Sequence, residues 1–177
     1  ILVMIRIFIS GLPASGKTTL VMKVVEEVRS AGISAGGFIT KEVRRGGARV
    51  GFKVIDIASG KSGWLAHVNP PGHRFGKYYV KLNEFVNVAL PALNYALKEC
   101  DVIVIDEIGK MEFISHNFRE ILLKVLQTGK SVLAVVHRDL ANKYKKCGEL
   151  IWVERNNTNL LVEKITKELY TSIGSTK

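Results

Sequence analysis

The residues best suited to chemistry stand near the start of the chain, in the segment Gly11-Leu-Pro-Ala-Ser-Gly16-Lys17-Thr18. This segment fits the pattern G-x4-G-K-[S/T], follows an apolar stretch typical of a strand and precedes a run with helical spacing, which is the context of a phosphate-binding loop. Its glycines let consecutive backbone N–H groups turn inward around a phosphate, and the N-terminus of the following helix adds positive partial charge. The predicted nucleotide-binding residues are Gly11, Leu12, Pro13, Ala14, Ser15, Gly16, Lys17, Thr18 and Thr19.

A second candidate segment has four aliphatic residues followed by two carboxylates, Val102-Ile-Val-Ile-Asp106-Glu107. A buried strand here would bring Asp106 to the carboxyl edge of a parallel sheet, where ligands bind in open α/β folds. Thr18 and Asp106 are therefore the predicted Mg²⁺ ligands, and Lys17 is predicted to reach the β- and γ-phosphates. Glu107 is predicted to orient or deprotonate an attacking water, which favours hydrolysis.

Positive side chains must neutralise the charge on a phosphoryl group while it is transferred. Lys110, three residues after Glu107, is a predicted catalytic residue for this role. Arg138, at the end of the next predicted strand, and Arg155, after the last one, are predicted to contact the nucleotide. For each of the three, a surface salt bridge or a solvated position is the alternative. His137 is interpreted as a polar residue at a strand end.

Alternating strand and helix patterns must position these residues. Strands are predicted at residues 4–10, 36–40, 50–57, 60–66, 102–106, 131–136 and 150–153, of which those at residues 4–10 and 102–106 are expected to be buried. Helices are predicted at residues 18–30, 84–99 and 160–173, with a further helix capped by Ser115 and ended by Gly129. Three irregular features are also expected: a hairpin turn at residues 44–47, a loop at residues 67–76, and a kink or break at Pro91.

Near-continuous apolar strands in the second half of the chain indicate a parallel sheet covered on both faces. The hairpin region at residues 36–66 interrupts the alternation and predicts antiparallel strands added to that sheet. We therefore expect one α/β domain over residues 1–177, with a mainly parallel sheet, added antiparallel strands and helices on both faces.

The chain has 177 residues, of which 47% are hydrophobic, and a formal net charge of +10. The apolar fraction excludes a disordered chain, and the positive charge favours anionic partners. The basic residues are dispersed, so nucleic acid is a conceivable partner that the sequence does not specifically indicate. No apolar run approaches the length of a membrane span, and the start at residues 1–10 is interpreted as a core strand and not a signal peptide. Cys100 and Cys147 are expected to be free thiols in a reducing cytoplasm. We also expect a monomer without a membrane partner.

Four segments resemble the small nucleoside-triphosphatases of hyperthermophiles, a family related to the human cancer-related nucleoside triphosphatase. They are residues 11–20, Gly37-Phe-Ile-Thr-Lys-Glu42-Val-Arg44, Arg49-Val-Gly51-Phe52 and, most specifically, Asp106-Glu-Ile-Gly-Lys-Met-Glu112. The resemblance extends from residue 4 to about residue 170. It implies a RecA-like P-loop fold and Mg²⁺-dependent hydrolysis of ATP, GTP, CTP and UTP, with some phosphotransfer, and it supports Lys110 as a site residue.

The chain departs from the family pattern at three places. Ala14 stands where the loop often has Gly, and Asn157-Thr158 stands where family members tend to have Asn-Arg. The loop around Pro70-Pro71 is longer than usual.

Two other functions remain open beside nucleoside-triphosphate hydrolysis. A nucleotide or nucleoside kinase would need an acceptor pocket and an arginine-rich lid, for which His73-Arg74 is the one weak candidate. A nucleic-acid-stimulated ATPase would use the positive charge, but no platform of interleaved aromatic and basic residues is evident in the sequence.

Overall fold

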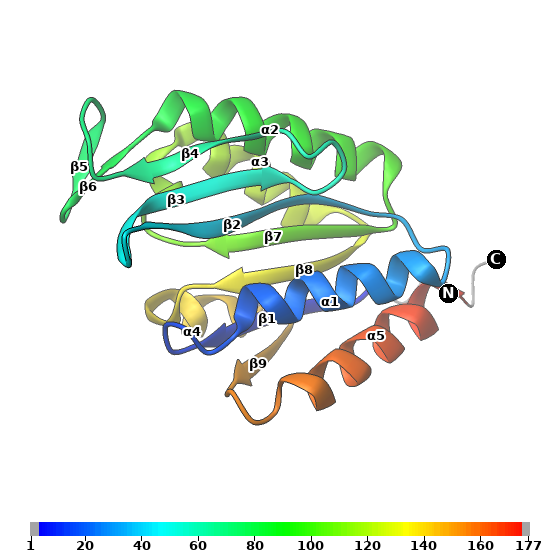
Figure 1. Ribbon diagram of the computed structural model, residues 1–177. Helices are drawn as coiled ribbons and strands as arrows, with labels where there is room; N and C mark the ends of the chain where they lie inside the picture. Colours follow the sequence, from blue (N-terminus) through cyan, green and yellow to red (C-terminus); the bar gives the residue numbers. More distant parts are fainter. Residues whose placement is uncertain (1–3, 175–177) are drawn as a thin grey trace.

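The computed structural model describes residues 4–174, which form a nine-stranded sheet with helices on both faces (Figure 1). The strands are β1 (Arg6–Gly11), β2 (Ala35–Arg45), β3 (Ala48–Asp56), β4 (Ser62–His67), β5 (His73–Phe75), β6 (Tyr78–Val80), β7 (Val102–Ile108), β8 (Ser131–Val136) and β9 (Glu149–Val153). The helices are α1 (Lys17–Ser30), α2 (Leu82–Glu99), α3 (His116–Gln127), α4 (Ala141–Tyr144) and α5 (Thr158–Gly174). The predicted first strand corresponds to β1, and residues 1–3 lie outside the described residues.

One half of the sheet is parallel, as predicted. The strand order is β5-β6-β4-β3-β2-β7-β8-β1-β9, and the pairs β2–β7, β7–β8, β8–β1 and β1–β9 are parallel. The aliphatic residues of β7 and β8 are buried because helices cover both faces. The carboxyl ends of β1, β7 and β8 therefore meet at one edge, which brings together the segments that the sequence marks as functional.

The other half of the sheet is antiparallel. The β2–β3 hairpin turns through Gly46 and Gly47, which both have a positive φ, and this confirms the predicted turn. The strands β4, β6 and β5 follow in antiparallel pairs. The prediction of a loop throughout residues 67–76 is wrong at its end, because β5 occupies His73–Phe75. This three-residue strand depends on pairing with β6, and such short-range alternation is too brief to stand out in the sequence.

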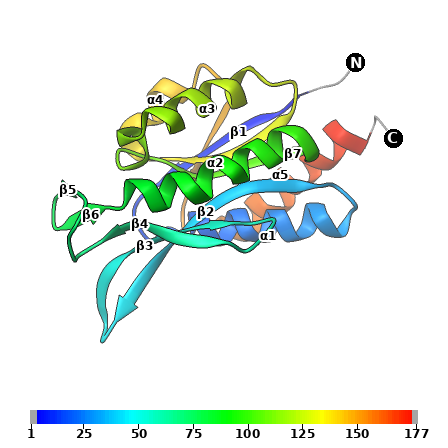
Figure 2. The ribbon, with the colours of Figure 1, turned by 90° about the horizontal axis from the view of Figure 1, so that it is seen from above.

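The helices form two layers (Figure 2). One hydrophobic cluster packs α2 and α3 against one face of the sheet, and a second packs α1 and α5 against the other. The prediction of a break at Pro91 is wrong, because α2 continues through this residue. Buried residues before and after it, such as Val88 and Leu93, pack on the same sheet and hold the two parts of the helix together. The predicted cap of α3 is confirmed, since the Ser115 hydroxyl accepts a hydrogen bond of 3.1 Å from the backbone N–H of Phe118.

Within residues 4–174, none of the helices combines the length and apolar character that crossing a bilayer requires.

Candidate active site

The loop between β1 and α1 adopts a backbone path that depends on glycine. A Cβ atom at Gly11 would lie 2.7 Å from the Val153 carbonyl oxygen and 2.9 Å from the Ser15 hydroxyl, so no larger residue fits there. Gly16 has a φ of 93°, which L side chains rarely adopt. Ala14 has a φ of 57°. The departure from glycine at this position therefore places a residue with a Cβ in the left-handed region, at a cost of about 1–2 kcal/mol.

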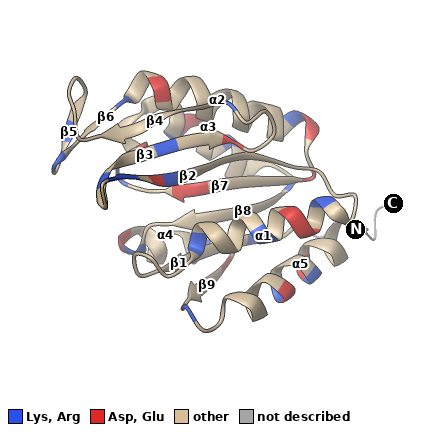
Figure 3. Cartoon of the chain, viewed as in Figure 1, with Lys and Arg blue, Asp and Glu red and all other residues tan. Residues whose placement is uncertain are grey.

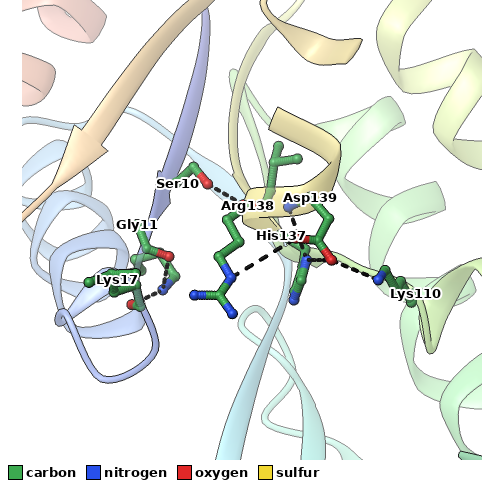
Figure 4. Close-up of polar contacts among 9 residues, drawn as sticks. Ser10, Gly11, Lys17, Lys110, His137, Arg138 and Asp139 are labelled. Atoms are coloured by element: carbon green, nitrogen blue, oxygen red, sulfur yellow. Dashed lines mark hydrogen bonds and ion pairs between the residues drawn. The ribbon is translucent and has the colours of Figure 1, made fainter. Parts of the chain in front are cut away.

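Lys17 is the first residue of α1, and its ammonium group lies at the mouth of the loop. Its Nζ atom donates hydrogen bonds to the carbonyl oxygens of Gly11 at 3.2 Å and Leu12 at 2.7 Å (Figure 4). Burial lowers the pKa of Lys17, and the carboxylates of Glu107 and Asp106 act in the opposite direction. The lysine therefore stands where the loop would receive the terminal phosphates of a nucleotide.

Thr18 and Asp106 are brought into direct contact, although 88 positions separate them in the sequence. The Thr18 hydroxyl donates a hydrogen bond of 2.6 Å to Asp106 Oδ2, and Asp106 is 2% exposed at the end of β7. Burial raises the pKa of Asp106 to about 7, and the hydrogen bond from Thr18 opposes this shift. A hydroxyl and a desolvated carboxylate in contact form a set of oxygen donors that suits Mg²⁺, a hard cation.

Glu107 follows Asp106 and lines the same cavity. Burial raises the pKa of Glu107, while electrostatic interactions with His137 and Lys17 act to lower it. The carboxylate is thus a stronger base than an ordinary glutamate, which suits the predicted role toward water.

The candidate active site is a cavity of roughly 550 Å³ at the carboxyl edge of the sheet. Predicted residues on its wall are Pro13, Ala14, Lys17, Thr18, Asp106, Glu107, Lys110 and Arg138. The remaining lining residues, which sequence reasoning did not assign to the site, are Thr40, Glu42, Arg49, Phe52, Leu65, Phe75, Met111, Glu112, His137 and Asp139. Several of them belong to the segments that carry the family resemblance, which was the available signal.

The three predicted cations differ in position. Lys110 lines the cavity, as predicted, and it also forms an ion pair of 2.7 Å with Asp139 (Figure 4). The predicted place at the site and the alternative of a salt bridge therefore both apply to this residue. Arg138 also lines the cavity, and its Nε atom lies 4.0 Å from Asp139 Oδ1. The positive charge of Arg138 contributes to the lowered pKa of Lys17. Arg155 is not a lining residue. It contacts the loop from the β9 side, where its Nε atom donates a hydrogen bond of 3.3 Å to the Ala14 carbonyl oxygen.

Glu112 is a buried carboxyl at the site that sequence reasoning did not select, although it ends the most specific family segment. It is 3% exposed, and it accepts hydrogen bonds from its own backbone N–H and that of Gly109. Burial and the charge of Glu107 raise its pKa well above the usual range. A Cβ atom at Gly109 would lie 2.7 Å from Glu112 Oε2 and 2.9 Å from Glu107 Oε1, so the two carboxyl groups flank this glycine.

A glycine-bounded loop after β1, with acidic residues at the end of β7, is the arrangement that is typical of nucleotide-binding proteins with a P-loop. The chain belongs to the NTPase family, whose model matches residues 6–166. It is 43% identical to nucleoside-triphosphatase THEP1 of Methanocaldococcus jannaschii over 164 residues, which cover 93% of this chain and 96% of the relative. It is 46% identical to the THEP1 protein of Pyrobaculum aerophilum over 166 residues, or 93% of each chain.

Two solved structures have the same fold. The crystal structure of THEP1 from the hyperthermophile Aquifex aeolicus superposes with a TM-score of 0.81 at 34% identity, covering 93% of this chain and 99% of the other. The solution structure of a human cancer-related nucleoside triphosphatase gives a TM-score of 0.77 at 34% identity, covering 95% and 98%. The family resemblance and the predicted α/β fold are thereby confirmed.

Proposed function

We propose that the protein hydrolyses nucleoside triphosphates to the diphosphate and phosphate, with Mg²⁺ as cofactor. The contact of 2.6 Å between Thr18 and Asp106, beside Lys17 and Glu107 in one cavity, carries this proposal. The relatives from Methanocaldococcus jannaschii and Pyrobaculum aerophilum are named nucleoside-triphosphatases, which supports the proposal.

The phosphate-binding loop and two side chains would hold the substrate. Backbone N–H groups of the loop would surround the β-phosphate, and Lys17 would exchange the carbonyl oxygens of Gly11 and Leu12 for phosphate oxygens. Thr18 and Asp106 would hold Mg²⁺, which supplies positive charge to the β- and γ-phosphate oxygens when bound.

Glu107 is the proposed general base. It would accept a proton from a water molecule as that water attacks the γ-phosphorus, and its raised pKa makes this transfer more favourable. Arg138 and Lys110, on the wall of the same cavity, are the proposed cations that neutralise charge during transfer. Since the loop binds phosphates that all nucleotides share, we propose ATP, GTP, CTP and UTP as substrates.

A kinase is less well supported, because the one candidate for a lid arginine points elsewhere. Arg74 pairs with Tyr79 on the sheet face opposite to Phe75, and Phe75 is the β5 residue that lines the cavity.

Phosphate release with each of the four nucleotides, with and without Mg²⁺, tests the proposal directly. Glu107→Gln should keep the rise in melting temperature that nucleotide causes but lose about 10²–10⁴-fold in turnover. Lys17→Ala should lose both. Glu26→Gln and Lys23→Ala, at exposed positions of α1, are matched controls that should leave both unchanged. Absence of phosphate release with every nucleotide would refute the proposal, and normal turnover by Glu107→Gln would refute the role of that residue.

The roles of the cations can be separated by steady-state kinetics. If Arg138 and Lys110 act mainly on the transition state, their alanine variants lower kcat at little change in KM. Arg155→Ala should leave kcat unchanged, because Arg155 lies outside the cavity.

A further inference from the structure

The antiparallel half of the sheet presents aromatic and basic side chains on the face opposite to the cavity. Cross-strand partners in a sheet share a face, and two rows of partners cross this face. The first row is Lys41, Lys53 and Trp64 of β2, β3 and β4, and the second is His67, Tyr79 and Arg74 of β4, β6 and β5. We call these six residues the aromatic–basic face.

The neighbouring residues along each strand fix the direction of this face. Phe52, Val54 and Leu65 belong to the hydrophobic cluster under α2 and α3, so Lys53 and Trp64 point the other way. On that other face, the cluster under α1 reaches Ile39 and Ile55. The aromatic–basic face lies outside the part of the sheet that this cluster covers. All six of its side chains are half-buried or exposed.

Charge and aromatic surface are interleaved on this face. Lys53 Nζ lies 5.3 Å from the centre of the Trp64 ring, and the Trp64 and His67 rings are 4.5 Å apart. None of the six residues is acidic, and Glu42, the nearest acidic residue in β2, lies on the cavity side opposite Phe52. Figure 3 shows further basic segments at the tip of the β2–β3 hairpin, where Arg44 and Arg45 precede the turn.

We infer that the aromatic–basic face binds single-stranded nucleic acid, with bases stacked on Trp64 and Tyr79 and phosphates held by Lys41, Lys53 and Arg74. Each base that stacks on an aromatic side chain contributes about 1–3 kcal/mol to the binding free energy, and basic side chains bind the phosphates along the nucleic-acid backbone. Aromatic rings that are accessible on a sheet face suit unpaired bases, because a double helix keeps the faces of its bases stacked inside. The six residues come from five strands, which explains why the linear sequence does not display the platform.

Fluorescence anisotropy tests this inference without any nucleoside triphosphate, so its outcome is independent of the proposed hydrolysis. The probes are labelled single strands of about 12 nucleotides, as RNA and as DNA, and a duplex of the same sequence. We expect both single strands to bind more tightly than the duplex, with affinity that falls as salt rises from about 50 mM. No change in anisotropy at about 10 µM protein, or a duplex that binds as tightly as the single strands, would overturn the inference.

A tryptophan signal locates the contact. The chain has two tryptophans, and Trp152 lies on β9, at the opposite end of the strand order from β4, β5 and β6. In the Trp152→Phe variant, fluorescence reports Trp64 alone, and stacking should quench it on addition of unlabelled oligonucleotide. Unchanged fluorescence under conditions where anisotropy shows saturation would place binding elsewhere.

Charge-matched variants separate this face from the overall charge of the protein. Lys41→Glu with Lys53→Glu should weaken binding by more than about tenfold, as should Trp64→Ala. Lys145→Glu with Lys146→Glu changes the charge equally at exposed positions after α4 and should weaken binding by no more than about twofold. Equal losses in the two double variants would overturn the inference, and melting curves check that all variants are folded.

Discussion

The close approach of β2 to β7 at Gly37 predicts a large effect from a single methyl group. Gly37 pairs with Val104 and has a φ of 122°, a backbone conformation that is essentially confined to glycine. A Cβ atom there would lie 1.9 Å from the Val104 carbonyl oxygen and 2.9 Å from its carbonyl carbon. Since real Cβ atoms do not come closer than 3.0 Å, Gly37→Ala must push the two strands apart.

Two contributions set the magnitude of this effect. The backbone strain of an L residue at such a φ costs about 1–3 kcal/mol. Each weakened hydrogen bond between β2 and β7 adds roughly 1 kcal/mol. We therefore expect Gly37→Ala to lower the free energy of unfolding by about 3–5 kcal/mol. For a domain of this size, that loss lowers the melting temperature by at least about 6 °C.

Gly46→Ala is the matched control. Gly46 also has a positive φ, of 55°, but a Cβ atom there would meet nothing within 4 Å. This variant isolates backbone strain, at about 1–2 kcal/mol. Circular dichroism melting compares the two, and phosphate release should fall further in Gly37→Ala because β7 carries Asp106. If the two variants melt within about 2 °C of each other, the close approach of β2 to β7 is refuted.

Three further predictions concern titration, thiol reactivity and helix capping. Burial raises the pKa of Glu112 in the folded chain, so the ionisation of Glu112 costs stability as the pH rises. Glu112→Gln should therefore raise the melting temperature at about pH 8 and not at about pH 4. The control Glu26→Gln, at an exposed position, should leave the melting temperature unchanged at both pH values. Cys147 is exposed, whereas Cys100 is buried and burial raises its pKa, so a thiol reagent should modify one cysteine per native chain and two after denaturation; two fast reactions in the native chain would contradict this. Ser115→Ala should cost about 1 kcal/mol in an unfolding titration, since it removes the cap of α3, and an unchanged midpoint would show that the cap contributes nothing.

Local sequence signals were sufficient for the parallel half of the fold. The predicted strand at residues 131–136 has the bounds of β8, and the helix predicted from residue 18 begins at Lys17. Each of these elements has its own apolar pattern and its own glycine or capping signal, so no distant contact is needed to recognise it. The short strands β5 and β6 have no such pattern, because three residues are stable as a strand only when paired.

The site was predictable where one strand end or one loop supplies the chemistry. Lys17, Thr18, Asp106 and Glu107 line one cavity because parallel strands end at the same edge. The opposite wall comes from the antiparallel strands, whose register the sequence does not reveal. The partner of Lys110 was likewise hidden, since Asp139 is 29 positions away and meets it only through the packing of β7 beside β8.

The alternation of side chains along β2 and β3 places two different surfaces on the same backbone. Lys41 and Glu42 are neighbours in sequence, as are Phe52 and Lys53, yet one member of each pair lines the cavity and the other lies on the aromatic–basic face. β2 also pairs with β7, which carries the acidic residues, so a shift of this strand reaches both surfaces. If an oligonucleotide on the face changes the affinity of the cavity for nucleotide, then nucleotide must change the affinity for the oligonucleotide by the same factor. Titrating each ligand in the presence of the other measures this factor twice, and a factor of one in both titrations would show that the two surfaces are not coupled.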